Sequence, residues 1–153
     1  MKALLQRVSR AHVEIAGQAV GEIGRGIVVL LGLDRDDDRA IADRMLDKLL
    51  AYRVFPDADG RMNCSVAQVS GGVLLVSQFT LSADTRKGLR PGFSPAMPPA
   101  EAQPLYEYML GQLRRRHAEV AAGVFGADMQ VSLTNDGPVT FLLEIADTTS
   151  ARA

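Results

Sequence analysis

Polar side chains end an apolar run near the middle of the chain. The run spans residues 73–81, and its last five residues are Ser-Gln-Phe-Thr-Leu. If the whole run is a strand, Gln78 and Thr80 lie on one face and Ser77 and Phe79 on the other. Hydroxyl and amide groups in a core strand need hydrogen-bond partners, which a substrate can supply. The segment is therefore a candidate substrate site, although a strand that emerges into solvent has the same local pattern.

A second candidate lies between the last two predicted strands, where residues 135–138 read Asn-Asp-Gly-Pro. These residues form a turn signal, and an ordinary hairpin turn is the simplest interpretation. The alternative is a cis peptide bond before Pro138. Such bonds are rare, so one at this position would indicate a special backbone geometry.

The third candidate is the basic segment of residues 84–91. It carries Arg86, Lys87 and Arg90 against a single acid, Asp84, so its local charge is +2 in a chain whose formal net charge is −1. A glycine and a proline inside the segment favour a loop whose backbone approaches an anion. A solvated surface loop is the alternative.

Composition excludes several classes of protein. The 153 residues are 47% apolar and 23% charged, with 17 Lys and Arg against 18 Asp and Glu. These values suit one folded domain with a core, and they exclude a disordered chain and a strongly basic DNA-binding protein. The longest apolar run, residues 26–33, is far shorter than the ~20 residues of a membrane-spanning helix.

Residues that bind metals or form disulfides are few. Cys64 is the single cysteine, which excludes a disulfide scaffold within one chain, and with only His12 and His117 the chain lacks the ligands of a usual Cys/His zinc site. We expect no metal and no other cofactor. The chain opens directly into a strand-like segment without a secretory signal, which predicts a cytoplasmic protein.

Short runs of β-branched or alternating residues predict strands over 3–8, 12–15, 19–23, 27–33, 73–81, 129–133 and 139–145. Glycine and proline separate most of these runs. The expected fold is a single α+β domain. Its mostly antiparallel, barrel-like sheet has two main helices packed on one side.

Apolar residues at helical spacing predict the two helices. The first covers about residues 40–50, with aspartates 36–38 at its start, and the second begins after Pro98-Pro99. Three arginines, residues 114–116, fall in the last turns of the second helix, where cations favour the helix dipole. Contact with an RNA backbone is the alternative for these arginines.

Two segments together carry a resemblance to a known family. They are Ser-Gln-Phe-Thr-Leu at residues 77–81 and Gly-Pro-Val-Thr-Phe at residues 137–141. The chain resembles the bacterial D-aminoacyl-tRNA deacylases, also called D-tyrosyl-tRNA deacylases. The resemblance runs from Met1 through the loop at 87–91 to about Ile145, and the two motifs in this order and separation are specific.

We expect residues 1–147 to form the domain and the terminal residues 148–153 to be a disordered tail. The resemblance implies a homodimer with a barrel-like α+β fold. It implies hydrolysis of the ester that joins a D-amino acid to the terminal ribose of tRNA, and of glycine mischarged on tRNA for alanine. No membrane, metal or cofactor is implied. The Gly137-Pro138 pair of one subunit, with a cis peptide bond, enters the other subunit's pocket. A rigid wall there rejects L side chains by a clash and lets D side chains and glycine pass.

The resemblance also suggests catalytic roles. Thr80 and Gln78 are the expected catalytic residues, acting as groups that position substrate or water, because no base that would activate Thr80 lies beside it in the sequence. Backbone N–H groups near Phe79 and Thr80 are expected to form an oxyanion hole. The ribose 2′-hydroxyl of the substrate then assists the attacking water.

The remaining expected site residues bind rather than react. The substrate-binding residues are Ser77, Phe79, Gly137 and Pro138. The residues expected to contact the acceptor end of tRNA are Arg86, Lys87 and Arg90.

Three other functions remain open. One is a nucleic-acid-binding module that uses the same fold without hydrolysis, although such a module needs neither motif. Another is a related deacylase that favours a small achiral or L-alanyl substrate through a trans Gly-Pro bond. A generic thioesterase-like hydrolase is the most distant alternative.

Overall fold

A long first strand organises the sheet of this protein. The computed structural model describes residues 1–146, so the predicted disorder of residues 148–153 lies outside the described part. The elements in chain order are β1 (Lys2–Ile15), β2 (Gln18–Ile23), β3 (Gly26–Gly32), α1 (Arg39–Ala51), β4 (Arg53–Pro56), β5 (Met62–Ser65), β6 (Gly72–Ser77), the 3-10 turn η1 (Phe79–Ser82), α2 (Pro99–Arg116), β7 (Val120–Ala122) and β8 (Gln130–Glu144).

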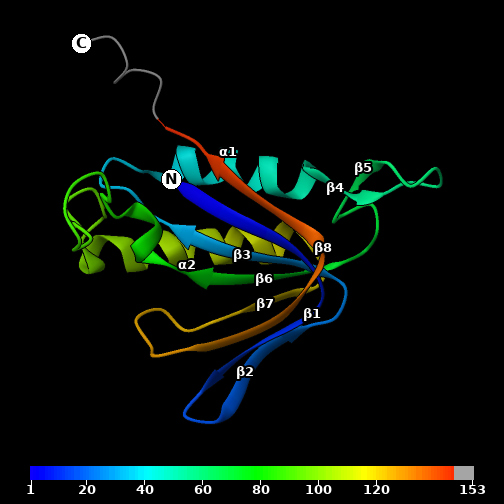
Figure 1. Ribbon diagram of the computed structural model, residues 1–153, viewed down its shortest axis with the longest axis horizontal. Helices are drawn as coiled ribbons and strands as arrows, with labels where there is room; N and C mark the ends of the chain where they lie inside the picture. The colour runs from blue at the N-terminus through cyan, green and yellow to red at the C-terminus, as the bar shows by residue number, and fades with distance from the viewer. Residues whose placement is uncertain (147–153) are drawn as a thin grey trace.

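The main sheet is mixed and nearly closes on itself. Its strand order is β2-β1-β3-β6-β7, with β8 also paired to β1. β1 is antiparallel to β2, β3 and β8, whereas β3–β6 and β6–β7 are parallel. β2 lies against β7 so closely that a Cβ atom at Gly21 would be 2.7 Å from the carbonyl oxygen of Ala122. The expected barrel-like, mostly antiparallel sheet is therefore confirmed (Figure 1).

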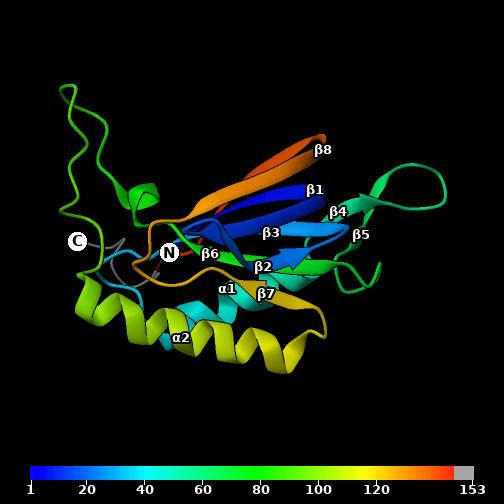
Figure 2. The same ribbon diagram turned by 90° about the horizontal axis from the view of Figure 1, so that it is seen from below.

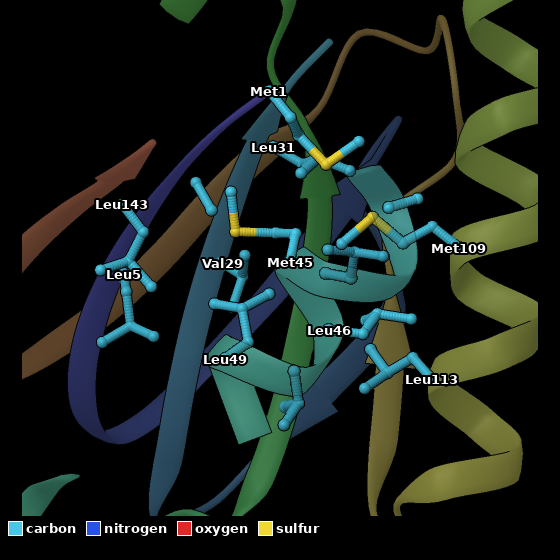
Figure 3. Packing of buried hydrophobic residues seen from close by; sticks show 14 of the residues in the cluster. Met1, Leu5, Val29, Leu31, Met45, Leu46, Leu49, Met109, Leu113 and Leu143 are labelled. Carbon is cyan, nitrogen blue, oxygen red and sulfur yellow. The ribbon is translucent and has the colours of Figure 1, made fainter. Parts of the chain in front are cut away.

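Two apolar layers hold the fold together. The larger one fills the space between the sheet and the helices, which both cover the same side of the sheet (Figure 2). Leu5, Val29 and Leu31 contribute from the strands, and Met45 and Met109 contribute from α1 and α2 (Figure 3). The smaller layer lies on the opposite face of the curved strands. Its buried residues are Val8, Ala11, Val13, Ile23, Val28, Leu74 and Val76.

Both helices form where their sequences predict them, with α1 one residue longer at each end and α2 beginning at Pro99 rather than after it. Asp38 caps α1, and its carboxylate accepts a 2.8 Å hydrogen bond from the backbone N–H of Ile41. The three arginines lie in the last turn of α2. Arg116 joins the two helices, because its guanidinium lies 2.8 Å from carboxylate oxygens of both Asp43 and Asp47.

Several predicted strand boundaries are wrong. The predicted pair 3–8 and 12–15 is one strand, because a register shift between Val8 and Arg10 lets β1 continue through the expected turn. The last two predicted strands are likewise the single strand β8. The run 73–81 ends as a strand at Ser77. The short strands β4, β5 and β7 were not predicted. Among residues 1–146, no helix is long and apolar enough to cross a membrane.

Candidate active site

The chain leaves β6 in a tight turn rather than as a strand. Ser77 is paired with Leu31 at the end of the parallel ladder, and the next amide, of Gln78, still donates to the Leu31 carbonyl at 2.7 Å. From Phe79 the backbone forms η1, with hydrogen bonds from Leu81 N to the Gln78 carbonyl at 3.2 Å and from Ala83 N to the Thr80 carbonyl at 3.1 Å. A 3-10 turn has no internal acceptor for its first N–H groups. The amides of Phe79 and Thr80 are thus left for another partner.

The side chains of this turn do not alternate as in a strand. Gln78 donates a short hydrogen bond from its amide nitrogen to the hydroxyl of Thr80. Gln78 and Thr80 therefore lie close together as predicted, but because of the 3-10 turn and not because of strand alternation. Phe79 is 59% exposed and packs on Phe93, with ring centroids 5.1 Å apart. The turn that holds the free amides therefore also carries two polar side chains and one exposed aromatic ring.

A pocket of about 650 Å³ opens beside the turn. Ser77, Gln78 and Phe79 line it, whereas Thr80 is not among the lining residues of the described chain. The other lining residues are Leu31, Leu33, Arg35, Val76, Phe93, Ala96, Met97, Pro98, Pro99, Ala102, Tyr106, Phe125, Gly126, Ala127, Met129 and Val131. The walls are mostly apolar, as in sites that take a small organic group.

Tyr106 anchors the deep wall of the pocket. Its hydroxyl donates to the Leu75 carbonyl at 3.2 Å, and its side chain is almost fully buried. Burial raises the pKa of Tyr106 to about 12. The phenol therefore stays neutral at physiological pH, and its role is to shape the pocket wall rather than to transfer protons.

The basic segment forms a loop that extends from the body of the protein, before α2 (Figure 2). Backbone hydrogen bonds of 2.7 and 3.0 Å between Asp84 and Gly92 close its base. Arg86 donates to both carboxylate oxygens of Asp84, at 2.9 and 2.8 Å, and its guanidinium holds the pKa of Asp84 well below the usual range. Lys87 and Arg90 form no ion pair within residues 1–146. Arg86 therefore differs from Lys87 and Arg90, because the neighbouring Asp84 carboxylate balances the charge of Arg86 alone.

Gly137 and Pro138 lie at a kink in β8, and the peptide bond between them is cis. β8 pairs with β1 through Asn135 and again from Thr140, and the register shifts in between. Both residues of the Gly-Pro pair are exposed. The segment therefore presents its backbone outward instead of turning the chain into a hairpin.

Asn135 and Arg7 fix the shape of this kink. The Asn135 amide donates to the carbonyls of Arg7 and Val139, at 2.9 and 3.0 Å, and accepts from Val139 N at 3.3 Å. Arg7 donates to the Asp136 carbonyl at 2.9 Å and to the Val54 carbonyl at 2.6 Å. No local sequence pattern marks Arg7, because these partners lie 129 and 47 residues away. Asn135 stands out in the sequence only as a turn residue.

We expect Asn135→Asp to destabilise the protein. A carboxylate accepts but does not donate, so the carbonyls of Arg7 and Val139 would lose their donor and face a negative charge. Loss of such partners costs roughly 1–3 kcal/mol in the free energy of unfolding. Urea denaturation of the variant measures this loss. Gln18→Glu is the control, because it makes the same amide-to-carboxylate change at an exposed position of β2 whose side chain forms no hydrogen bond within residues 1–146. An equal loss there would contradict the assignment.

The turn and the kink are far apart within one chain. Ser77 is level with Ala3 across the sheet, whereas the kink is level with Arg7. Along the sheet, four residues of strand, about 13 Å, and three strand spacings separate the two. Val131 of β8 does line the pocket, but the kink lies six residues further along that strand, about 20 Å away. β8 bends at the end of the sheet opposite to the end at which β3 and β6 stop (Figure 1). Gly137 and Pro138 are also absent from the pocket walls of the described chain.

The chain is similar to known proteins over nearly its whole length. The protein-family model described as "D-Tyr-tRNA(Tyr) deacylase" matches residues 4–144. The chain belongs to the D-Tyr-tRNA(Tyr) deacylase family. This family consists of hydrolases, so the expected family and enzyme class are confirmed.

Relatives in this deacylase family match nearly the whole chain. The D-aminoacyl-tRNA deacylase of Cellvibrio japonicus is 64% identical over 145 residues, which are 95% of this chain and 99% of the relative. The D-aminoacyl-tRNA deacylase of Stutzerimonas stutzeri is 61% identical over 144 residues, which are 94% of this chain and 99% of the relative.

Two solved structures resemble this deacylase-family chain. A structure named "c-Myc DNA Unwinding Element Binding Protein" is 44% identical, with a TM-score of 0.92 over 95% of this chain and 99% of that one. A probable eukaryotic D-amino acid tRNA deacylase has a TM-score of 0.79 over 94% of this chain and 98% of that one. Its identity is only 19%, so it supports the fold alone. Within residues 1–146, no three His, Cys, Asp or Glu side chains are grouped to hold a metal.

Proposed function

We propose that this protein hydrolyses the ester of D-aminoacyl-tRNA and releases the D-amino acid and tRNA. The observation that carries the proposal is the turn after β6, which leaves two backbone amides beside a large apolar pocket. The D-aminoacyl-tRNA deacylases that are more than 60% identical to this chain support the same substrate. Because charged tRNA is a cytoplasmic substrate in bacteria, we also propose a cytoplasmic location.

The pocket suits the terminal adenosine of the substrate. Aromatic residues Phe79, Phe93 and Phe125 contribute to its walls, and its volume of about 650 Å³ leaves room for a base and its ribose. Stacking of a base on an aromatic side chain contributes about 1–3 kcal/mol. Since every tRNA ends in the same nucleoside, this pocket accepts any tRNA and leaves the amino acid at its mouth.

The turn supplies the groups for the reaction. The amides of Phe79 and Thr80 donate to the ester carbonyl oxygen as it gains negative charge, and one well-placed donor contributes about 2.7–4 kcal/mol to transition-state stabilisation. The ribose 2′-hydroxyl orients the water that attacks the carbonyl carbon. The bond from this carbon to the ribose 3′-oxygen then breaks, and a proton of the water passes to the departing oxygen. Gln78 and Thr80 hold the water and the substrate in place.

Chirality is read by the Gly137-Pro138 segment of a second subunit. Within one chain this segment lies six residues further along β8 than Val131, which lines the pocket, a separation of about 20 Å along the strand. A second copy is therefore proposed to supply it. Gly137 has no Cβ, which lets its backbone approach the α-carbon of the substrate. An L side chain would clash with this wall, whereas a D side chain points away. Glycine passes too, so glycine on tRNA for alanine is a proposed second substrate.

Matched D-tyrosyl-, L-tyrosyl- and glycyl-tRNA, at equal enzyme concentration, test the proposal. We expect rapid loss of the D and glycyl esters, with the L ester intact. Hydrolysis of L-alanyl-tRNA instead would indicate the related small-substrate deacylase. Nucleic-acid binding without hydrolysis is the second candidate, favoured by the name of the 44% identical structure. Bound tRNA with no ester cleaved would establish that function and overturn ours.

Thr80→Ala is expected to lower kcat by about 10- to 100-fold, the effect of losing a group that helps orient a substrate. Removal of a true nucleophile costs about 10⁶-fold. Single-turnover deacylation of D-tyrosyl-tRNA distinguishes the two, with Ser132→Ala as the control, because Ser132 carries an exposed hydroxyl and does not line the pocket. A 10⁶-fold loss at Thr80 would establish covalent catalysis and remove the water-attack mechanism.

A further inference from the structure

A single charged residue lines the otherwise uncharged pocket. Arg35 follows β3, and it is the one Lys, Arg, Asp or Glu among the lining residues of the described chain. Its guanidinium Nε donates to the Ser94 carbonyl at 3.0 Å, and its backbone N–H donates to the Pro95 carbonyl at 2.9 Å. These two bonds hold the arginine at the rim, next to the segment that carries Phe93. The two terminal nitrogens of the guanidinium have no hydrogen-bond partner within residues 1–146.

The acidic stretch around Arg35 does not neutralise it. Asp34 accepts from the N-terminal ammonium of Met1 at 3.1 Å and from Lys2 at 3.4 Å. Asp37 accepts from the same ammonium at 2.6 Å, and Asp38 caps α1. No ion pair involves Arg35 in the described part of the chain. Asp36, which follows Arg35, is exposed and forms no ion pair within residues 1–146 either. Arg35 is likewise exposed, and it offers a guanidinium without a carboxylate partner at the mouth of the apolar cavity.

We propose that Arg35 binds the 5′-phosphate of the terminal nucleotide of the substrate. The proposal rests on the proposed function, because the phosphate is joined to the nucleoside that occupies the pocket. When the base lies among the aromatic walls and the ester lies at η1, the phosphate emerges at the rim. A guanidinium with two free terminal nitrogens matches two phosphate oxygens, and arginine is well suited to such bidentate binding.

Arg35 lines the pocket, whereas the cations of the basic loop at residues 84–91 lie outside it. None of Arg86, Lys87 and Arg90 lines the pocket, and Asp84 already engages Arg86. The loop cations are therefore placed for phosphates that precede the terminal one, whereas Arg35 is placed for the last phosphate. This order predicts that a single terminal nucleotide is enough to reveal the effect of Arg35.

Two small substrates separate the contribution of the phosphate from that of the pocket. They are the 3′-D-tyrosyl ester of adenosine and the same ester of adenosine 5′-monophosphate. For the unmodified protein we expect kcat/KM to be about 10-fold higher for the phosphate-bearing ester, the scale of one charge-assisted hydrogen-bonded pair. Arg35→Gln is expected to make kcat/KM equal for the two esters, by lowering the value for the phosphate-bearing ester and leaving the value for the adenosine ester unchanged. Arg35→Lys is expected to keep part of it.

D-tyrosyl-tRNA gives a second, independent measurement. The slope of log(kcat/KM) against log salt concentration is expected to become shallower by about 0.7 in Arg35→Gln, as for one lost phosphate contact on a single strand. Arg44→Gln is the matched control, because Arg44 is an exposed arginine on α1 and does not line the pocket. It is expected to change neither the ratio nor the slope.

The outcomes distinguish this proposal from the proposed function. Equal losses in Arg35→Gln on both small esters would show a general effect through Ser94 and overturn phosphate binding. An unchanged salt slope with D-tyrosyl-tRNA would also overturn it, even if neither small ester is cleaved. Failure of the unmodified protein to cleave D-tyrosyl-tRNA would instead overturn the proposed function.

Discussion

Gly137→Ala is expected to lower kcat/KM for D-tyrosyl-tRNA by roughly 100-fold or more, the effect of displacing a site by about an ångström. A Cβ atom at this position would clash with the backbone nitrogen of Val139, and it would lie 2.6 Å from the Cγ2 atom of the same valine. The residue also has φ +157°, a conformation that L side chains rarely adopt. The segment must therefore shift, and with it the surface that faces the substrate. Single-turnover deacylation measures the loss.

A glycine in open space provides the control for this variant. A Cβ added at Gly24 would have no atom within 4 Å, and this glycine has no positive φ, so Gly24→Ala is expected to keep full activity. Circular dichroism and urea denaturation of both variants show whether the fold persists. Full activity in a folded Gly137→Ala variant would show that this segment lies outside the site.

Mixed dimers are expected to recover activity from two inactive variants. Ala127 lines the pocket at a half-buried loop position, so Ala127→Trp fills the pocket and blocks the nucleoside. If Gly137 acts in the other subunit's pocket, a dimer of one Ala127→Trp chain and one Gly137→Ala chain has one complete site and one site damaged twice. With C2 symmetry, its activity is expected to be about half that of the unmodified dimer.

Two affinity tags on coexpressed chains isolate the mixed dimer for this measurement. Each variant alone is expected to keep about 1% of the activity or less, the counterpart of a 100-fold loss. An inactive mixed dimer would place Gly137 and the pocket in the same subunit's site. Failure of the two tags to copurify would contradict a dimer altogether.

Local patterns predicted the helices well and the strands less well. Asp38 and the apolar spacing of α1 are local signals, and the structure follows them. Ser9 to Ala11 and Asn135 to Pro138 also look local, as turns, but β1 and β8 run through them with register shifts. Pairing along both strands keeps these segments extended, and a sequence pattern does not show such long-range pairing.

The candidate site was predicted where its chemistry is local. Ser77 to Thr80 and Gly137-Pro138 stand out by residue type alone. Arg7 and Arg35 do not, because their contacts with Val54 and Ser94 lie 47 and 59 residues away. Arg35 also lies among aspartates at residues 34–38, and the sequence does not show which of these carboxylates pair with other cations.

The turn after β6 affects how such an enzyme tolerates mutation. In the proposed reaction the donors that stabilise the ester oxygen are amides of the main chain, which every residue except proline possesses. Exchange of a side chain at Phe79 or Thr80 leaves these donors present, so long as the turn keeps its shape. Side-chain changes there therefore affect the positioning and binding of the substrate but leave the donors to the ester oxygen in place, whereas proline at either position would delete one of these donors.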